Sequence, residues 1–329
     1  MNNKLYPFLF KPIYKEKIWG GNNLKSLAAF KNINYNNVGE IWLISGLEND
    51  STIVSNGFLK GNSLNELIEI YMDDIVGEKV YEKFANHFPI LIKFIDAADK
   101  LSVQVHPDDS LAANLYGSPN GKTEMWYIIK AEANSWIVNG FNTNIAKEEF
   151  VNYLKNNKIE NILNFINIKN DDVFLIPAGR VHAIGKNIML AEIQQASDYT
   201  YRIYDWNRNS KESNRKLHTE LALQAIDFNN NKNTKISYTQ TLNNKIPLVT
   251  ENFFSTFLLI LNKPFKTDYF ELGSFIAYIC IEGNADIYYY DNDKIKIKQG
   301  HAVLIPPEIN TYTIIPKNYV KLLEIYLEP

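Results

Sequence analysis

Apolar and polar residues alternate in the manner of β-strands over much of the chain. Residues 100–106 (KLSVQVH) alternate with a period of two, which places Ser102, Gln104 and His106 on one face of a strand. The apolar run 88–94 (FPILIKF) is typical of a buried strand. Further short runs between turn-forming residues predict strands at 39–54, 122–129, 172–176, 181–184, 189–194 and 200–204. The pattern predicts a mainly β protein, a jelly roll or related sandwich, with a few helices on its surface.

Helical spacing appears in only a few segments. Residues 63–77 (SLNELIEIYMDDIVG) begin with Ser63 and carry Glu66 three positions later, which is the pattern of a capping box. A short helix is predicted after Pro107. Two stretches between residues 146 and 167, AKEEFVNYLKNN and KIENILNFIN, are also predicted to be surface helices.

The chain has 329 residues, which is more than a single domain usually contains. Residues 227–244 are polar and rich in asparagine, so they are the best candidate for a linker. We therefore expect two modules. Residues 1–230 would form an N-terminal module with the helical insertions, and residues 245–329 would form a smaller β module.

The net charge of −3 provides no basic surface for a nucleic acid, and a small-molecule partner fits better. The only cysteine, Cys280, lies in an apolar run and excludes an internal disulfide framework. No apolar run approaches the roughly 20 residues that cross a bilayer, and no secretion signal is visible. The expectation is a cytoplasmic protein that does not bind membranes and is a monomer or a weak homo-oligomer.

Three residues of ligand type occur in separate motifs. The segment SVQVHPDD supplies His106, KTEMWY supplies Glu124, and FLIPAGRVHAIG supplies His182. Two neutral imidazoles and one carboxylate form the mixed donor set of a catalytic divalent metal site. A buried Glu124 without a partner would be costly, and a metal would remove that cost. Gln104, on the strand face of His106, is the candidate fourth ligand.

Charged residues surround these motifs. The segment GSPNGKT (117–123) looks like a phosphate-binding loop, but its glycine spacing is one residue short and a β-rich run follows it. Lys122 instead shares a strand face with Glu124. Downstream of His182 lie Glu192, Asp198, Arg202 and Arg208. Acids and bases beside a metal suit proton transfer on a phosphorylated or polyhydroxy substrate.

The motifs QVHPDD, GKTEMWY, PAGRVHAIG and EIQQASDYTYRIYDW together resemble the type I mannose-6-phosphate isomerases in their short bacterial form, which are members of the cupin superfamily. The resemblance runs from about Pro12 to Trp206. It implies two cupin-like modules and a zinc-dependent interconversion of mannose 6-phosphate and fructose 6-phosphate through a cis-enediol.

The resemblance also implies roles for individual residues. One Zn²⁺ per chain would be bound by Gln104, His106, Glu124 and His182. Arg202 matches an active-site arginine, and Glu192 matches a candidate proton carrier. Ser102, Lys122 and Arg208 match positions proposed to hold the substrate or its phosphate, and Lys122 is also a candidate for catalysis. The group that removes the proton stays open among Glu192, a zinc-bound water and a lysine.

Two other functions fit part of the pattern. Two histidines and a carboxylate also describe a non-haem iron oxygenase, but Gln104, Lys122 and the arginines argue against it. A sugar-binding cupin without activity would not need the ligands together with Glu192 and Arg202. The C-terminal module keeps Gly300 and Pro306 of the PAG motif, but Thr311 stands where a histidine would be, so no metal is expected there.

Overall fold

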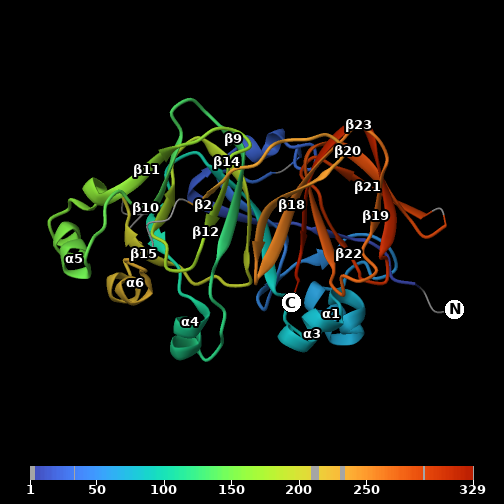
Figure 1. The fold of residues 1–329 in the computed structure, drawn as a ribbon, viewed down its shortest axis with the longest axis horizontal. Coiled ribbons are helices and arrows are strands. Elements are labelled where there is room, and N and C mark those ends of the chain that lie inside the picture. The colour runs from blue at the N-terminus through green and yellow to red at the C-terminus, as the bar shows by residue number, and fades with distance from the viewer. Residues whose placement is uncertain (1–3, 33, 209–214, 230–233, 292, 329) are drawn as a thin grey trace.

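The computed structural model describes residues 4–32, 34–208, 215–229, 234–291 and 293–328, and within these ranges most strands belong to three antiparallel sheets (Figure 1). The central sheet has the order β16 (Lys235–Ile236), β12 (Val173–Ile176), β9 (Glu124–Ala131), β14 (Ile188–Gln195), β7 (Ile90–Ala97), β2 (Ile13–Gly21) and β3 (Val38–Ile44). The outer sheet has the order β11 (Leu163–Asn167), β10 (Trp136–Phe141), β13 (His182–Ile184), β8 (Val103–Val105) and β15 (Tyr201–Tyr204). The predicted mainly β fold is confirmed.

The third sheet, the C-terminal sheet, has the order β17 (Lys245–Glu251), β18 (Phe254–Leu261), β23 (Thr311–Tyr326), β20 (Ile276–Tyr289), β22 (Ala302–Ile305), β1 (Phe8–Lys11) and β6 (Ile53–Val54). Strand β19 (Phe265–Asp268) pairs with β23, and β21 (Asp293–Lys298) pairs with β20. A small hairpin joins β4 (Gly46–Leu47) and β5 (Asp50–Ser51).

The central sheet is buried on both faces because its side chains alternate between two cores. On β9, Met125 and Tyr127 belong to a core shared with strands of the C-terminal sheet. Trp126 and Ile128 point the other way, into a core shared with Ile137 and Ile184 of the outer sheet. Strand β9 begins with a glutamate on the second face, so the fold places a carboxylate between the central and outer sheets.

Helices cover the edges of the sheets: α1 (Leu64–Tyr71), α2 (Asp73–Val76), α3 (Glu78–Phe84), α4 (Asp109–Tyr116), α5 (Lys147–Lys155) and α6 (Thr219–Ala225), with 3-10 turns η1 (Asn23–Ser26) and η2 (Ile159–Ile162). In Figure 1, α1 and α3 lie below the C-terminal sheet, and α5 and α6 lie at the opposite end. No helix in the described ranges is long and apolar enough to cross a membrane.

The capping box predicted at Ser63 and Glu66 is present, and the helix that follows it is divided at Met72, which has φ 50°. The prediction of a second helix between residues 158 and 167 is wrong. That segment makes only the turn η2 and then becomes β11, whose residues Phe165 and Ile166 pair with β10. Pairing with an existing strand outweighs the helical spacing of a short apolar run.

Parts of both predicted modules share one sheet. Strand β1, near the start of the chain, pairs Phe8 with Leu304 of β22. Within the predicted linker, Lys235 and Ile236 form β16 and pair with β12, whereas residues 230–233 lie outside the described residues. The division into residues 1–230 and 245–329 stays a prediction.

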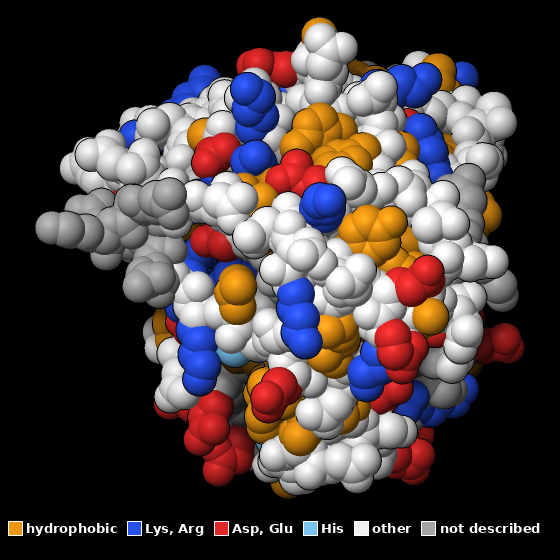
Figure 2. Space-filling model, turned by 90° about the vertical axis from the view of Figure 1, so that its left-hand side faces the viewer, with side chains coloured by type: hydrophobic (Ala, Val, Ile, Leu, Met, Phe, Trp, Pro, Cys, Tyr) orange, Lys and Arg blue, Asp and Glu red, His pale blue; other side chains and the backbone are white. Residues whose placement is uncertain are grey.

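Seen from the end that lies on the left of Figure 1, the surface carries Lys and Arg side chains interspersed with Asp, Glu and apolar side chains (Figure 2).

Candidate metal centre and active site

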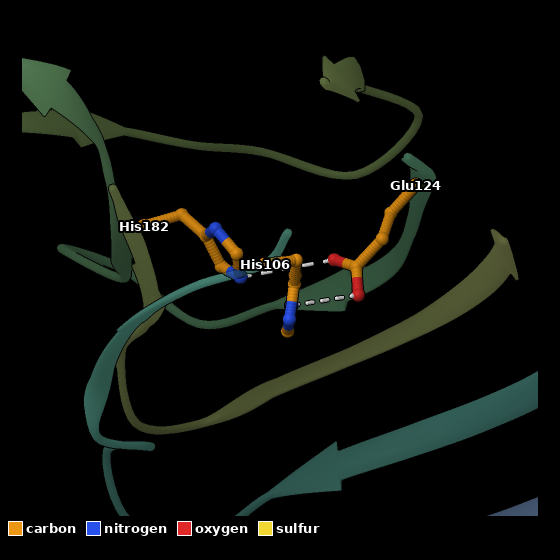
Figure 3. Close-up of side chains that lie close together, drawn as sticks. All are labelled: His106, Glu124 and His182. Carbon is orange, nitrogen blue, oxygen red and sulfur yellow. Dashed lines mark ion pairs between the residues drawn. The ribbon is translucent and has the colours of Figure 1, made fainter. Parts of the chain in front are cut away.

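The three candidate ligands come together between the central and outer sheets (Figure 3). His106 follows β8, Glu124 opens β9 and His182 opens β13. One ligand atom from each of the three residues lies within 4.8 Å of the others, and all three side chains are buried. The side-chain amide of Gln104 lies next to them, with Nε2 3.2 Å from Nε2 of His182.

Backbone carbonyls fix the orientation of both imidazoles. Nδ1 of His106 lies 2.8 Å from the carbonyl oxygen of Tyr199, and Nδ1 of His182 lies 2.8 Å from that of Arg180. A carbonyl only accepts, so each Nδ1 carries the proton and each Nε2 keeps its lone pair. These Nε2 atoms face Glu124 at 3.1 Å and 3.8 Å. The two Nε2 lone pairs and the carboxylate of Glu124 therefore lie close together, in the way that the ligands of one metal ion do.

The protonation states also suit a cation. Burial lowers the pKa of His106 and lowers that of His182 to about 3, so both rings are neutral near pH 7. Burial acts to raise the pKa of Glu124, but the ammonium of Lys122, 2.7 Å away, and His106 hold it well below its usual range. Two neutral nitrogens and one ionised carboxylate form a donor set that fits a divalent metal ion.

Glu124 and Gln104 line a cavity of about 250 Å³ beside the two histidines. Polar residues dominate its lining, which consists of Lys17, Trp19, Glu40, Lys93, Ile95, Leu101, Ser102, Gln104, Lys122, Glu124, Ile184, Glu192, Asp198, Thr200, Arg202 and Arg215. A cavity with convergent charges beside a metal-type donor set is where a small polar substrate would be expected.

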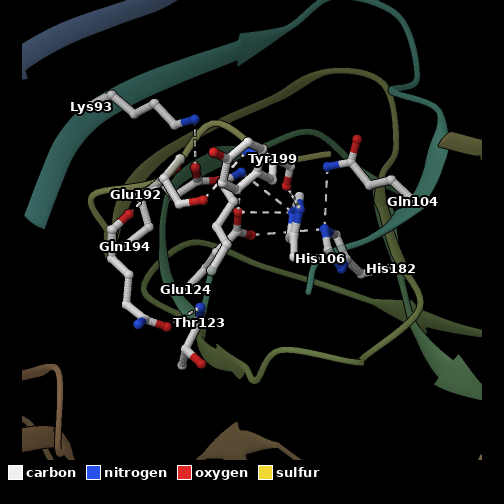
Figure 4. Close-up of polar contacts among 12 residues, drawn as sticks. Lys93, Gln104, His106, Thr123, Glu124, His182, Glu192, Gln194 and Tyr199 are labelled. Atoms are coloured by element: carbon white, nitrogen blue, oxygen red, sulfur yellow. Dashed lines mark hydrogen bonds and ion pairs between the residues drawn. The ribbon is translucent and has the colours of Figure 1, made fainter. Parts of the chain in front are cut away.

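Glu192 lies in the cavity wall in an ion pair with Lys93, at 2.7 Å (Figure 4). Burial and the neighbouring Glu124 raise the pKa of Glu192, although Lys93 opposes them. A buried carboxyl group with a raised pKa is suited to accept and return a proton. The structure thus puts a group suited to proton transfer in the wall of the cavity that Glu124 also lines.

Comparison with known proteins agrees with this geometry. Residues 8–136 match the family model for the catalytic domain of type I phosphomannose isomerase. The chain is 38% identical over 222 residues to "Mannose-6-phosphate isomerase ManA" of Bacillus subtilis, a match that covers 67% of this chain and 68% of that protein. It is 30% identical over 309 residues to "Mannose-6-phosphate isomerase" of Streptococcus mutans, covering 93% and 94% of the two chains. The chain belongs to the type I phosphomannose isomerase family.

The fold supports the same assignment. The solved structure of the mannose 6-phosphate isomerase from Bacillus subtilis superposes with a TM-score of 0.86 at 30% identity, covering 97% of this chain and 99% of that one. This member of the phosphomannose isomerase family is therefore similar to its relatives along nearly its whole length, including the C-terminal sheet, and it is an isomerase.

Of the two arginines predicted to act in the site, Arg202 lines the cavity and Arg208 does not. Nε of Arg202 donates to Oγ of Ser102 at 3.2 Å, and both residues line the cavity. Arg208 is not among the lining residues; its guanidinium lies 3.7 Å from Asp99 and 3.5 Å from Asp205. The predicted substrate role of Arg208 stays a prediction.

The sequence analysis did not identify several residues that line the cavity of the isomerase. Lys93 and Glu40 lie inside apolar runs, and Arg215 follows a polar segment; all three line the cavity. Burial acts to raise the pKa of Glu40, but Lys93 and Lys17 lower it to about 2. A single charged residue inside an otherwise apolar strand was the available signal for Lys93 and Glu40, because such a residue needs a buried partner. Nothing local distinguishes Arg215.

Proposed function

We propose that this isomerase interconverts mannose 6-phosphate and fructose 6-phosphate, with one zinc ion held by His106, Glu124, His182 and Gln104. The observation that carries the proposal is the convergence of two imidazole lone pairs and a carboxylate on a cavity that also contains basic side chains. The curated relatives named for this reaction support the choice of substrate.

The proposed reaction passes through a cis-enediol. A proton leaves C2 of the aldose and one is added to C1, while O1 gains a proton and O2 loses one. A bound zinc ion would supply a Lewis acid that stabilises negative charge on the oxygens of the substrate. Lys122 and Arg202, both in the cavity lining, add fixed positive charge where that negative charge develops.

Glu192 is the proton carrier that we favour. It is buried in the cavity wall, and burial and Glu124 raise its pKa, which suits a group that accepts a proton from one carbon and returns it to the next. Lys93, on the neighbouring strand β7, forms an ion pair with this carboxyl group. One carboxylate that serves both carbons leaves the enzyme unchanged after each turnover.

The phosphate of the substrate would be held by basic and hydroxyl groups in the cavity and beside it. Ser102 and Lys122 are proposed for this role, together with Arg208, which shares the carboxylate of Asp205 with Arg215. Guanidinium groups bind phosphate through paired hydrogen bonds.

The test is a coupled assay that measures fructose 6-phosphate formed from mannose 6-phosphate. Protein stripped of metal with a chelator should be inactive and should regain activity when zinc is added. The matched control is His182→Ala treated in the same way, which should stay inactive at the same zinc concentration. Stripped wild-type protein that does not respond to zinc would rule out the zinc-dependent isomerase.

A further inference from the structure

Four side chains form a row across the face of the central sheet that lines the cavity. Trp126 on β9 pairs in register with Glu192 on β14, which pairs with Lys93 on β7, which pairs with Trp42 on β3. Side chains opposite one another on neighbouring strands are close enough to interact directly. Both tryptophans are buried, and each donates its indole N–H to a carboxylate.

The two indoles differ in what they contact. Nε1 of Trp42 donates to Glu40 at 2.7 Å. Nε1 of Trp126 donates to two carboxylates at once, to Oε2 of Glu192 at 2.9 Å and to Oε2 of Glu124 at 3.2 Å. The ring of Trp126 also packs in a T-shaped arrangement against the imidazole of His182, with centroids 5.4 Å apart.

We propose that Trp126 is a positioning residue whose single indole N–H fixes the carboxylate of Glu124 against that of Glu192. The role rests on the proposed function only in that Glu124 is a metal ligand and Glu192 the proton carrier. Because the N–H is bonded to both, the distance between the ligand and the carrier is set by one rigid side chain.

The physical need for such a donor follows from the charges. The carboxylates of Glu124 and Glu192 are both buried and both reach the same indole N–H, and two like charges so placed repel one another. Among the described residues, no other hydrogen bond reaches Oε2 of Glu124, whereas Oε1 faces Lys122 and His106. A hydrogen bond to an ionised oxygen is stronger than one between neutral groups, so the indole holds Oε2 near His182 and leaves Oε1 towards His106 and Lys122.

The experiment compares Trp126→Phe with Trp42→Phe. Each substitution keeps an aromatic ring in a buried position and removes one indole N–H, but only the first N–H contacts a proposed ligand. Zinc affinity is measured by competition with a chelator, and kcat and KM for mannose 6-phosphate are measured on the zinc-loaded enzyme. We expect Trp126→Phe to lower zinc affinity by about 10-fold and kcat by at least as much, with little change in KM. Trp42→Phe should leave zinc affinity unchanged.

A second substitution separates the N–H from the shape of the ring. Benzothienylalanine at position 126 replaces the indole N–H by sulfur and keeps the bicyclic outline, so it should lower zinc affinity as Trp126→Phe does. Unchanged zinc affinity in this variant would overturn the proposal, as would equal losses in the variants at positions 126 and 42. Zinc affinity does not depend on the substrate, so it decides the role of Trp126 even if mannose 6-phosphate is not turned over.

Discussion

Nζ of Lys93 lies 2.7 Å from Oε1 of Glu192, and both side chains are buried. Removing one partner of such a pair leaves a buried charge alone, which costs on the order of 3 kcal/mol. Lys93→Met should therefore lower the free energy of unfolding by about that amount, measured by urea denaturation, and should also reduce kcat. Lys17→Met, which removes a half-exposed partner of Glu40, is the matched control and should cost less than about 1 kcal/mol. Equal effects of the two substitutions would contradict the buried pair.

The low pKa of Glu40 predicts a loss of stability in acid. Its folded pKa of about 2 lies below the ordinary value of 4.5, so the folded state favours the ionised form. The stabilisation is complete above about pH 4.5 and is lost as the pH falls towards 2, a change of about 3 kcal/mol. Unfolding free energies measured between pH 5 and pH 3 should fall more steeply in wild type than in Glu40→Gln. Parallel curves for the two proteins would mean that Glu40 does not contribute.

Metal binding and turnover should separate between two kinds of variant. His106→Ala and His182→Ala remove imidazole nitrogens that face Glu124, so both should lose zinc and activity together. Arg202→Ala removes a cavity guanidinium whose hydrogen bonds among the described residues go to Ser102 and to the carbonyl of Lys216 rather than to a ligand, and it should keep zinc while kcat falls by about 100-fold or more. Zinc content by elemental analysis, measured beside kcat, checks the separation. Loss of zinc from Arg202→Ala would show that the roles are wrongly assigned.

The C-terminal sheet contains an ion pair of its own, between buried Glu324 and half-buried Lys245. Oε1 of Glu324 lies 2.5 Å from Nζ of Lys245, and Oε2 accepts hydrogen bonds from Tyr269 and Tyr278. Lys245→Met should lower the stability of the whole protein by about 3 kcal/mol without changing zinc affinity, because the pair is remote from the metal ligands. Lys294→Met removes an exposed ammonium that pairs with Asp286, and it should cost less than about 1 kcal/mol. Thermal denaturation and zinc titration of both variants distinguish the outcomes.

The sequence predicted the ligand motifs because each ligand lies beside a turn or strand end that is visible locally. Pro107 ends the strand before His106, and the PAG turn precedes His182. Whether Lys93, Glu192 and Glu40 meet is decided instead by the register of β3, β7 and β14, which are far apart along the chain. No local pattern specifies that register, so the contacts among these three charged residues became visible only in the structure.

Pairing between strands, which no local pattern specifies, also explains the wrongly predicted helix. The run at 158–167 has apolar residues that fit a helix, but β10 offers a strand edge, and Phe165 and Ile166 pair with it. The mainly β architecture was nevertheless predictable, because alternation along β8 and apolar runs such as β7 are properties of short segments. The predicted roles of Ser102, Lys122 and Arg208 in holding the substrate stay predictions.

Strand β1 pairs with a strand that is made much later during synthesis. Phe8 and Leu9 pair with Leu304 and Val303, so an early strand waits for residues made near the end of translation. N-terminal segments leave the ribosome first, and an unpaired strand edge can pair with other chains. A nascent chain halted before residue 302 can pair β1 with β6 but lacks β22, the other partner of β1, and we expect such fragments to aggregate rather than persist as an active N-terminal part.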